Sequence, residues 1–189
     1  MMRTNNHRPK RNPESGVTLI ELVIAGVVLV FGMLSVMAVL ATAVGNNGRS
    51  KVDSTATMLT QAVVEQISAV LQGGGPGSIT DCQLVNGVPS TGSTWTINTT
   101  AGSPPTGSGA ALAGDVIDFT QSNPPAGFHM DYVECNGNVQ TTYDVRWNIQ
   151  TMSSNGTFLV TVGARPKSNL PNRFSFALPV TMRTYVGGS

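Results

Sequence analysis

The chain has 189 residues, which is enough for one helical stem and one modest globular domain. Only 11% of the residues are charged, and the formal net charge of +1 comes with no basic stripe, so the charge does not support general nucleic-acid binding. Abundant Gly, Ser, Thr and Asn are typical of exported β-rich domains with long turns.

The first segment with a strong pattern is residues 1–45. Positive charges gather near the start, at Arg3, Arg8, Lys10 and Arg11. Gly16-Val17-Thr18-Leu19-Ile20-Glu21 follows, and from Leu22 to Val44 the chain is uncharged. As a helix, that run would span roughly 35 Å, enough to cross a bilayer core. A carboxylate such as Glu21 costs about 2.5–3.5 kcal/mol in the middle of a membrane helix, so it calls for a partner or a function.

The segment from Gly16 to Leu22 resembles the type III signal of the type IV pilin superfamily, which includes type IV pilins, minor pilins and type II secretion pseudopilins. The resemblance implies that a prepilin peptidase removes residues 1–16 by cleaving after Gly16 and then N-methylates Val17. It also implies that Glu21 pairs with the free amino terminus of a neighbouring subunit during filament assembly. Such a pairing would avoid leaving either charge buried alone. The processed chain would keep seven bases against nine acids, a formal charge near −2.

Two other interpretations of the same segment remain open. A secretory signal peptide has an apolar core of about 7–15 residues, roughly half the length of this run, although Ala41-Thr42-Ala43 matches a small-x-small cleavage site. A plain single-pass anchor would explain the hydrophobicity, and the basic residues before the helix predict a cytoplasmic amino terminus. Neither interpretation explains an acidic residue placed five positions after a glycine.

Residues 46–72 continue with helical periodicity. Val52, Ala56, Leu59, Val63, Ile67 and Val70 recur at steps of three and four, which predicts an apolar stripe packed against a sheet. Gly73-Gly74-Gly75-Pro76-Gly77 predicts the end of the helix. Asn46-Asn47-Gly48 leaves open a hinge between two separate helices.

Residues 73–189 predict a periplasmic β-rich head. Strand patterns occur in six segments, and residues 79–88 are expected to be an irregular link or a short edge strand. Residues 101–114, rich in Gly, Pro, Ser and Thr, predict a surface loop. Asn155-Gly156 predicts a hairpin that joins the strands at 143–149 and 157–164. The six patterned segments are residues 94–97, 115–119, 128–133, 143–149, 157–164 and 173–186.

The overall fold class is therefore α+β: a long N-terminal amphipathic and transmembrane α-helix packed on a small, mainly antiparallel sheet, as in the pilin fold. The predicted pairing of strands 143–149 and 157–164 resembles V-type minor pilins and I-type pseudopilins. The expected segments are residues 1–16 as leader, 17–45 as assembly helix, 46–72 as amphipathic helix and 73–189 as head.

Cys82 and Cys135 are the two cysteines of the chain. In an exported domain, an even pair indicates one structural disulfide. A redox or metal pair is the alternative, but the chain has no Cys-x-x-Cys, and His129 is the one histidine after the leader. We expect no metal site and no cofactor.

Catalytic motifs are absent from the sequence, so we expect no enzyme activity. Asp115 with Asp118, and Asp131 with Glu134, are weak calcium candidates without a loop signature. Two sequence triplets match a glycosylation acceptor, at Asn98 and Asn155. Arg165-Pro166-Lys167, with Arg173, forms a small basic patch that we interpret as a turn kept soluble by charge.

Two function classes remain from the sequence. The first is a structural subunit, a minor pilin or pseudopilin of a type IV pilus or related filament, with a major pilin as a close alternative. It would be stored as a single-pass protein of the bacterial inner membrane, with its C-terminal domain in the periplasm, before entering the filament. Its expected partners are prepilin peptidase, other pilin subunits, the inner-membrane assembly platform and, before assembly, membrane lipid. The second class is a membrane-anchored periplasmic binding module that never enters a filament. The sequence does not distinguish pilus, secretion and competence systems.

Overall fold

The computed structural model describes residues 16–152, 156–167 and 178–187 of the chain. The chain divides between Asn46 and Asn47 into two compact units, which we describe separately. Within the described residues, the fold is one long N-terminal helix together with mainly antiparallel strands, so the predicted α+β class is confirmed.

The helix α1 extends from Leu19 to Leu71. It has no break at Asn46-Asn47-Gly48, so the alternative of two separate helices is wrong, and it ends one residue before the predicted Gln72. Gly73 adopts φ 86°, and the Gly74 amide donates to the Ala69 carbonyl at 2.8 Å. This left-handed glycine with a bond back into the last turn is a common helix C-cap, which explains the sharp stop.

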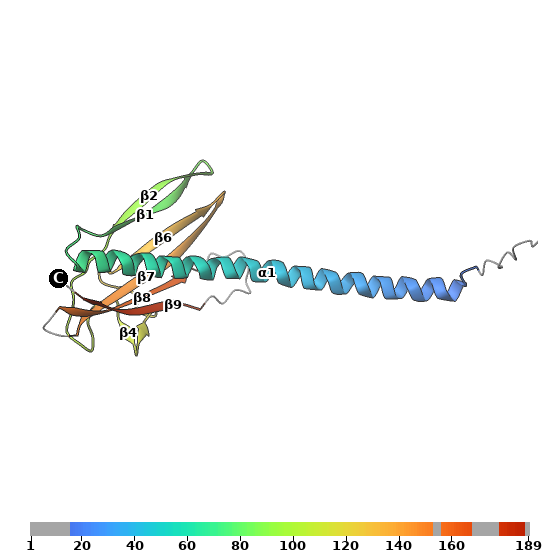
Figure 1. Ribbon diagram of the computed structural model, residues 1–189. Helices are drawn as coiled ribbons and strands as arrows, with labels where there is room; N and C mark the ends of the chain where they lie inside the picture. Colours follow the sequence, from blue (N-terminus) through green and yellow to red (C-terminus); the bar gives the residue numbers. More distant parts are fainter. Residues whose placement is uncertain (1–15, 153–155, 168–177, 188–189) are drawn as a thin grey trace, which may run out of the picture. The chain divides into compact units, whose positions relative to one another are not determined.

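The head contains a five-stranded antiparallel sheet in which β7 is the central strand (Figure 1). β7 pairs with β8, and β8 pairs with β9; on its other side β7 pairs with β6 along one half and with β3 near its far end. The predicted pairing of 143–149 with 157–164 is confirmed, since Ile149 lies opposite Val160. The bounds are β3 Ser108–Gly109, β6 His129–Asn136, β7 Val139–Thr151, β8 Thr157–Pro166 and β9 Val180–Gly187.

Within the head, the second half of α1 packs its apolar stripe against one face of this sheet (Figure 1). Ala56, Leu59, Val63 and Ile67 are buried against the inward side chains of β7 and β8, as the periodicity predicted. Burying a side chain of this size contributes about 1.5–3 kcal/mol, so this stripe is a main source of head stability. The facing residues are Tyr143, Val145, Trp147, Ile149, Val160, Val162 and Ala164.

Part of the opposite face of the sheet is covered by residues 102–121, so the prediction of a surface loop at 101–114 is wrong in part. Ala110 is fully buried. Asn148 donates through Nδ2 to the carbonyls of Thr106 and Ala110, both at 2.9 Å, and Gln150 donates to the Pro105 carbonyl at 2.8 Å. Amide side chains on the outer face of β7 therefore hold this segment by its backbone carbonyls, a role that low-complexity composition does not reveal.

A second small core forms under this covering segment. The hairpin of β4 (Leu112–Ala113) and β5 (Val116–Ile117) buries Ile117 with Ala110 and Phe119. A Cβ at Gly163 of β8 would lie 3.0 Å from Ile117 and 3.1 Å from the Phe119 ring. Glycine at this position lets the two side chains lie directly on the sheet.

Residues 79–88 were predicted to be an irregular link or a short edge strand, and the structure shows most of a strand and the turn of a β-hairpin there, so the alternative of an irregular link is wrong. β1 (Ser78–Val85) pairs with β2 (Val88–Thr96) around Asn86-Gly87. Both turn residues have positive φ, 53° and 77°, as a type I′ turn requires. Asn-Gly is the usual signal for this turn, and it identifies the hairpin once the flanking strands are recognised. The last predicted segment, 173–186, includes all of β9 except its final residue, Gly187; residues 173–177 lie outside the described residues.

Candidate functional site

The start of α1 carries the residues that the sequence singled out. Gly16, Val17 and Thr18 precede the helix and are exposed. The Thr18 hydroxyl accepts a hydrogen bond from the Glu21 amide at 3.4 Å, and the Thr18 carbonyl accepts one from Leu22 at 3.2 Å. Thr18 is therefore the N-cap residue of α1.

The sequence analysis included Thr18 in the signal motif but did not predict its role as the helix cap. Thr-x-x-Glu before an apolar run matches a capping box, in which the acidic side chain also lies near the cap residue. Glu21 is exposed in the first turn, where a carboxylate interacts favourably with the helix dipole by about 0.3–1 kcal/mol. The described residues provide Glu21 with no salt bridge.

The first unit exposes a continuous apolar surface. Large apolar side chains from Val17 to Val44 are between 49% and 83% exposed, with Val23 and Leu19 at the two limits. Among the described residues, α1 is the one helix long and apolar enough to cross a membrane, with a mean hydropathy of 2.8 over its best 18-residue window. This unit is compatible with a single-pass membrane anchor.

Polar side chains within the apolar segment bond to their own helix. Ser35 donates to the Phe31 carbonyl at 2.9 Å, and Thr42 donates to the Val39 carbonyl at 2.8 Å. These hydroxyls therefore need no water, as an apolar environment demands. Gly26 and Gly32 are helical, and a Cβ at either would meet no described atom within 4 Å. Packing within the described chain thus gives no reason for glycine at these two positions.

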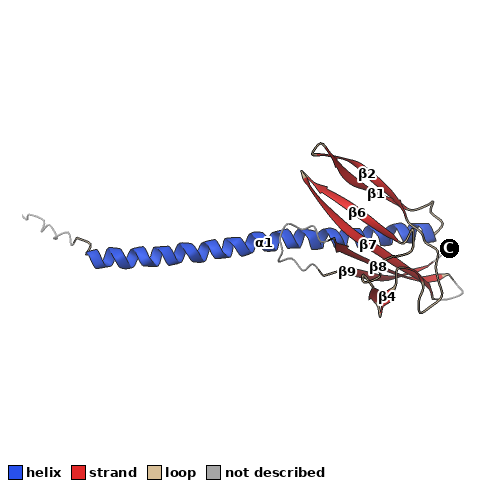
Figure 2. Ribbon diagram, turned by 180° about the vertical axis from the view of Figure 1, so that it is seen from behind, coloured by secondary structure: helices blue, strands red, loops and turns tan. Residues whose placement is uncertain are grey.

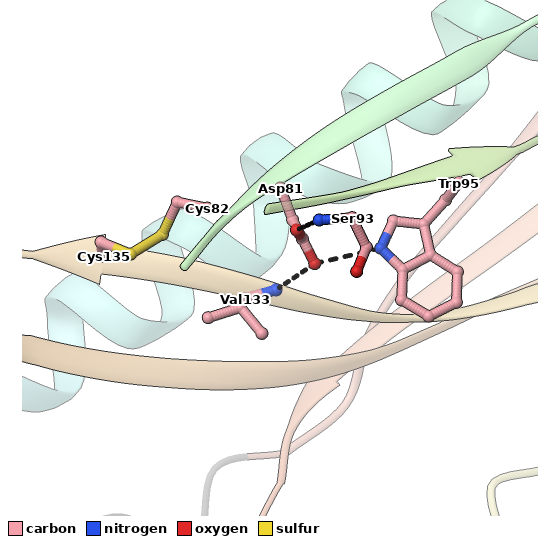
Figure 3. The surroundings of a disulfide bond; sticks show 6 residues. All are labelled: Asp81, Cys82, Ser93, Trp95, Val133 and Cys135. Atoms are coloured by element: carbon pink, nitrogen blue, oxygen red, sulfur yellow. Dashed lines mark hydrogen bonds between the residues drawn. A yellow bond between two sulfur atoms is a disulfide. The ribbon is translucent and has the colours of Figure 1, made fainter. Parts of the chain in front are cut away.

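The two cysteines form a disulfide in the structure (Figure 3). Cys82 in β1 and Cys135 in β6 have Cα atoms 6.0 Å apart, and the bond closes a loop with a sequence separation of 53. β1 and β2 form their own two-stranded sheet, which is not hydrogen-bonded through its backbone to β6. The disulfide therefore fastens the β1–β2 hairpin alongside the edge of the main sheet (Figure 2).

Asp81, next to Cys82, supplies a second link between the hairpin and the sheet (Figure 3). Its buried carboxylate accepts hydrogen bonds from the amides of Ser93 and Val133 and from the Trp95 indole N–H at 3.1 Å. Two residues of β2, Gly92 and Ser93, lie opposite this one residue of β1, which is a β-bulge. A Cβ at Gly92 would lie 2.2 Å from Asp81 Oδ1, so glycine makes room for the carboxylate.

We expect Asp81→Asn to lower the free energy of unfolding of the head by about 1–3 kcal/mol. An amide has one acceptor oxygen, so its NH₂ group must face at least one of the donors that Asp81 now satisfies. Urea titration of the purified full chain in detergent, followed by tryptophan fluorescence, measures the effect. Asp115→Asn is the matched control, because the Asp115 side chain is 80% exposed and its loss should change stability by less than about 0.5 kcal/mol.

The four acidic residues considered for calcium each have a partner of their own. Asp115 pairs with Arg183, Asp131 pairs with Lys167, and Glu134 accepts from the Tyr143 hydroxyl at 3.5 Å. Asp118 accepts from the amide and hydroxyl of Thr120, and these bonds hold the pKa of Asp118 below its ordinary value. The described residues contain no group of three or more His, Cys, Asp or Glu side chains placed to bind a metal ion.

The residues of the predicted basic patch are also paired. Arg165 bonds to Asp144 at 3.2 Å and Lys167 to Asp131 at 2.6 Å, whereas Arg173 lies outside the described residues. Of the two glycosylation triplets, Asn98 uses its side-chain oxygen to accept from the Thr100 amide at 2.9 Å, and Asn155 is outside the described residues.

Comparison with protein-family models, with curated proteins and with solved structures finds no match for this chain. A long apolar N-terminal helix, an antiparallel sheet and a disulfide within the head are compatible with a pilin-like fold.

Proposed function

We propose that this chain is a structural subunit, a minor pilin or pseudopilin, of a type IV pilus or a related filament. In this proposal prepilin peptidase cleaves after Gly16 and methylates Val17, and the apolar part of α1 then assembles with neighbouring subunits. The observation that carries the proposal is the placement of Glu21 in the first turn of α1, where the apolar side chains are exposed, directly after an exposed non-helical segment. The role is structural rather than catalytic.

The geometry at the proposed cleavage site supports this function. A protease needs its scissile bond in accessible backbone outside regular structure. The Gly16–Val17 bond meets both conditions, because Thr18 caps α1 and the helix begins at Leu19. After cleavage, the new amine of Val17 would precede the cap residue and lie close to the helix N-terminus.

The energetics of that amine support a role for Glu21. A positive charge is unfavourable at a helix N-terminus, and an unpaired charge in an apolar environment is strongly penalised. In the proposed filament the Val17 amine of one subunit pairs with Glu21 of its neighbour, so each neutralises the other. The pairing sets the axial register of the two helices.

The exposed apolar surface would serve in two environments. In the inner membrane it contacts lipid, and in the filament it contacts the same segment of other subunits, so extraction exchanges one apolar environment for another. Gly26 and Gly32, which leave open space on the helix, suit close helix packing between subunits.

Processing is the first test. Co-expression of the full chain with a prepilin peptidase should yield a protein whose intact mass lacks residues 1–16 and gains one methyl group. The control is a catalytically inactive peptidase, which should leave the chain at full length. An unshortened product with the active peptidase would reject the proposed signal.

Assembly is the second test, and Glu21→Ala is the decisive variant. We expect it to remain in the membrane fraction but to lose incorporation into sheared filaments by at least about tenfold, because the neighbour's amine would be left unpaired. Glu65→Ala removes an exposed carboxylate from the same helix outside the apolar segment and should incorporate normally. Normal incorporation of Glu21→Ala would instead favour the membrane-anchored binding module.

A further inference from the structure

A polar cleft of about 430 Å³ lies in the head on the face of the sheet opposite α1. The outer face of strands β6, β7 and β8 forms its floor, and the segment from Phe119 to Pro124 forms a wall. Its volume falls in the range of small-molecule sites, about 300–1,000 Å³. Its lining is mostly polar, unlike the apolar sites that take most cofactors and lipids.

Charged side chains on the floor form two rows across the strands. Asp131, Asp144 and Arg165 are register partners on β6, β7 and β8, and His129 and Arg146 lie in the next row. Partners in register point to the same face of a sheet. Two carboxylates, Asp131 and Asp144, are directly opposite each other, which is unfavourable unless cations compensate them.

The cations that compensate these carboxylates are held rigidly. Arg146 bonds to both oxygens of Asp144, at 2.8 and 2.9 Å, and its Nη1 donates to the Asp118 and Gln121 carbonyls. Arg165 bonds to Asp144 from the other side and places its guanidinium 4.7 Å from the centroid of the Phe119 ring. Arg146 lies near the same ring, at 5.3 Å.

Two cationic side chains on the cleft, Arg165 and Lys167, have N–H groups without a described partner, and these indicate which kind of ligand could bind. Arg146 is buried with its nitrogens engaged, whereas the Arg165 side chain is 38% exposed and its Nη1 has no partner among the described residues. Lys167, also on the cleft, has one described bond, to Asp131, from an ammonium that carries three N–H groups. The charged groups of the lining sum to one formal positive charge, so the cleft suits a ligand with a single negative charge.

The rest of the lining suits hydroxyl groups. Thr120, Gln121 and Ser122 bring polar side chains to the wall. The His129 Nδ1 lies 3.1 Å from the Pro125 carbonyl, which can only accept, so Nδ1 is the donor and Nε2 is left as an acceptor in the neutral ring. Asp131 adds a carboxylate acceptor at the same edge.

We infer that this cleft binds a sugar acid, a hydroxylated ligand with one carboxylate, of mono- or disaccharide size. The carboxylate would take the free N–H groups of Arg165 and Lys167, and the ring hydroxyls would bond to His129, Asp131 and the Thr120–Ser122 wall. The site is independent of Glu21 and of filament assembly.

Isothermal titration calorimetry of the full chain in detergent tests this inference with three probes. Galacturonic acid carries one carboxylate and several hydroxyls, its methyl ester keeps the hydroxyls without the charge, and acetate keeps a carboxylate without the hydroxyls. We expect the acid to bind and each of the other probes to bind at least about tenfold more weakly. No binding of the acid, equal binding of the ester, or equal binding of acetate would overturn the assignment of a sugar acid.

Two variants locate the binding. Arg165→Gln and Lys167→Gln should each weaken galacturonic acid binding by roughly tenfold to a hundredfold, because each removes a charged hydrogen bond. Arg183→Gln removes the same charge outside the cleft and should bind like wild type. Lys167 belongs to an exposed pair, so its variant should keep the fold, and unchanged affinity in Lys167→Gln and Arg165→Gln would refute the site.

Discussion

Asp144→Ala is expected to lower the free energy of unfolding of the head by about 3–5 kcal/mol, the largest effect of any substitution considered for this chain. The Asp144 side chain is 4% exposed and bonds to both Arg146 and Arg165. Its removal leaves the Arg146 guanidinium buried without a counter-ion. Arg146 also holds the Asp118 and Gln121 carbonyls, so the covering segment would loosen with it.

Urea titration monitored by tryptophan fluorescence is the appropriate measurement, because Trp147 of the same strand is fully buried in the core on the α1 side of the sheet. Asp131→Ala is the matched control. Asp131 pairs with Lys167, but both side chains are about half exposed, at 45% and 44%, and exposed pairs contribute about 0–1 kcal/mol. Equal losses of unfolding free energy from Asp144→Ala and Asp131→Ala would show that burial of the Asp144–Arg146 pair does not increase its contribution to stability.

Removal of the disulfide, by Cys82→Ser with Cys135→Ser, is expected to cost about 4 kcal/mol in the loop-entropy model for a separation of 53 residues. The hairpin of β1 and β2 has no backbone pairing to the main sheet, so the loss should concentrate there. Hydrogen exchange of the β1 and β2 amides measures this directly, and fluorescence gives the global value.

Wild-type protein treated with reductant is the control for the double variant, and the two should match in stability and in exchange. Asp81 still links the hairpin to Val133 in both samples, so the hairpin should loosen without detaching. A loss below about 1 kcal/mol, or two free thiols in the denatured, unreduced wild-type chain, would contradict this expectation.

The fold was predictable from the sequence where hydrophobic periodicity is long and regular. Two patterns each predicted the correct element and the correct buried face. They are the helical stripe from Ala56 to Ile67 and the strand alternation of Tyr143, Val145, Trp147 and Ile149. The glycine-rich stop after Gln72 gave the helix end to within one residue. These patterns depend on the local backbone period alone, so tertiary context did not overturn them.

The parts that were missed depend on contacts distant in sequence. The polar residues of β7 alternate as they would on a solvated face, yet Arg146, Asn148 and Gln150 are buried under the covering segment. The side chains of residues 101–114 do not indicate that this segment binds Asn148 and Gln150, because the segment contributes only backbone carbonyls to those hydrogen bonds. The cleft was missed for the same reason, since strand register brings Asp131, Asp144 and Arg165 together. At the start of α1, the role of Thr18 as the helix cap had a local signal, the capping-box spacing, and was nonetheless overlooked.

β7 binds residues 105–110 through their backbone carbonyls, and this limits which substitutions the segment can accept. Every amino acid carries a main-chain carbonyl, so most side chains of this stretch can be exchanged while the bonds from Asn148 and Gln150 persist. Gly107 and Gly109 are exceptions, because both have positive φ and an added Cβ would lie 2.3 Å from Asn148 Oδ1 or the Trp147 carbonyl oxygen. Ala110 is a third, because it is fully buried against Ile117 and Phe119. The outer surface of the head can therefore accept many side-chain substitutions as long as these positions are kept.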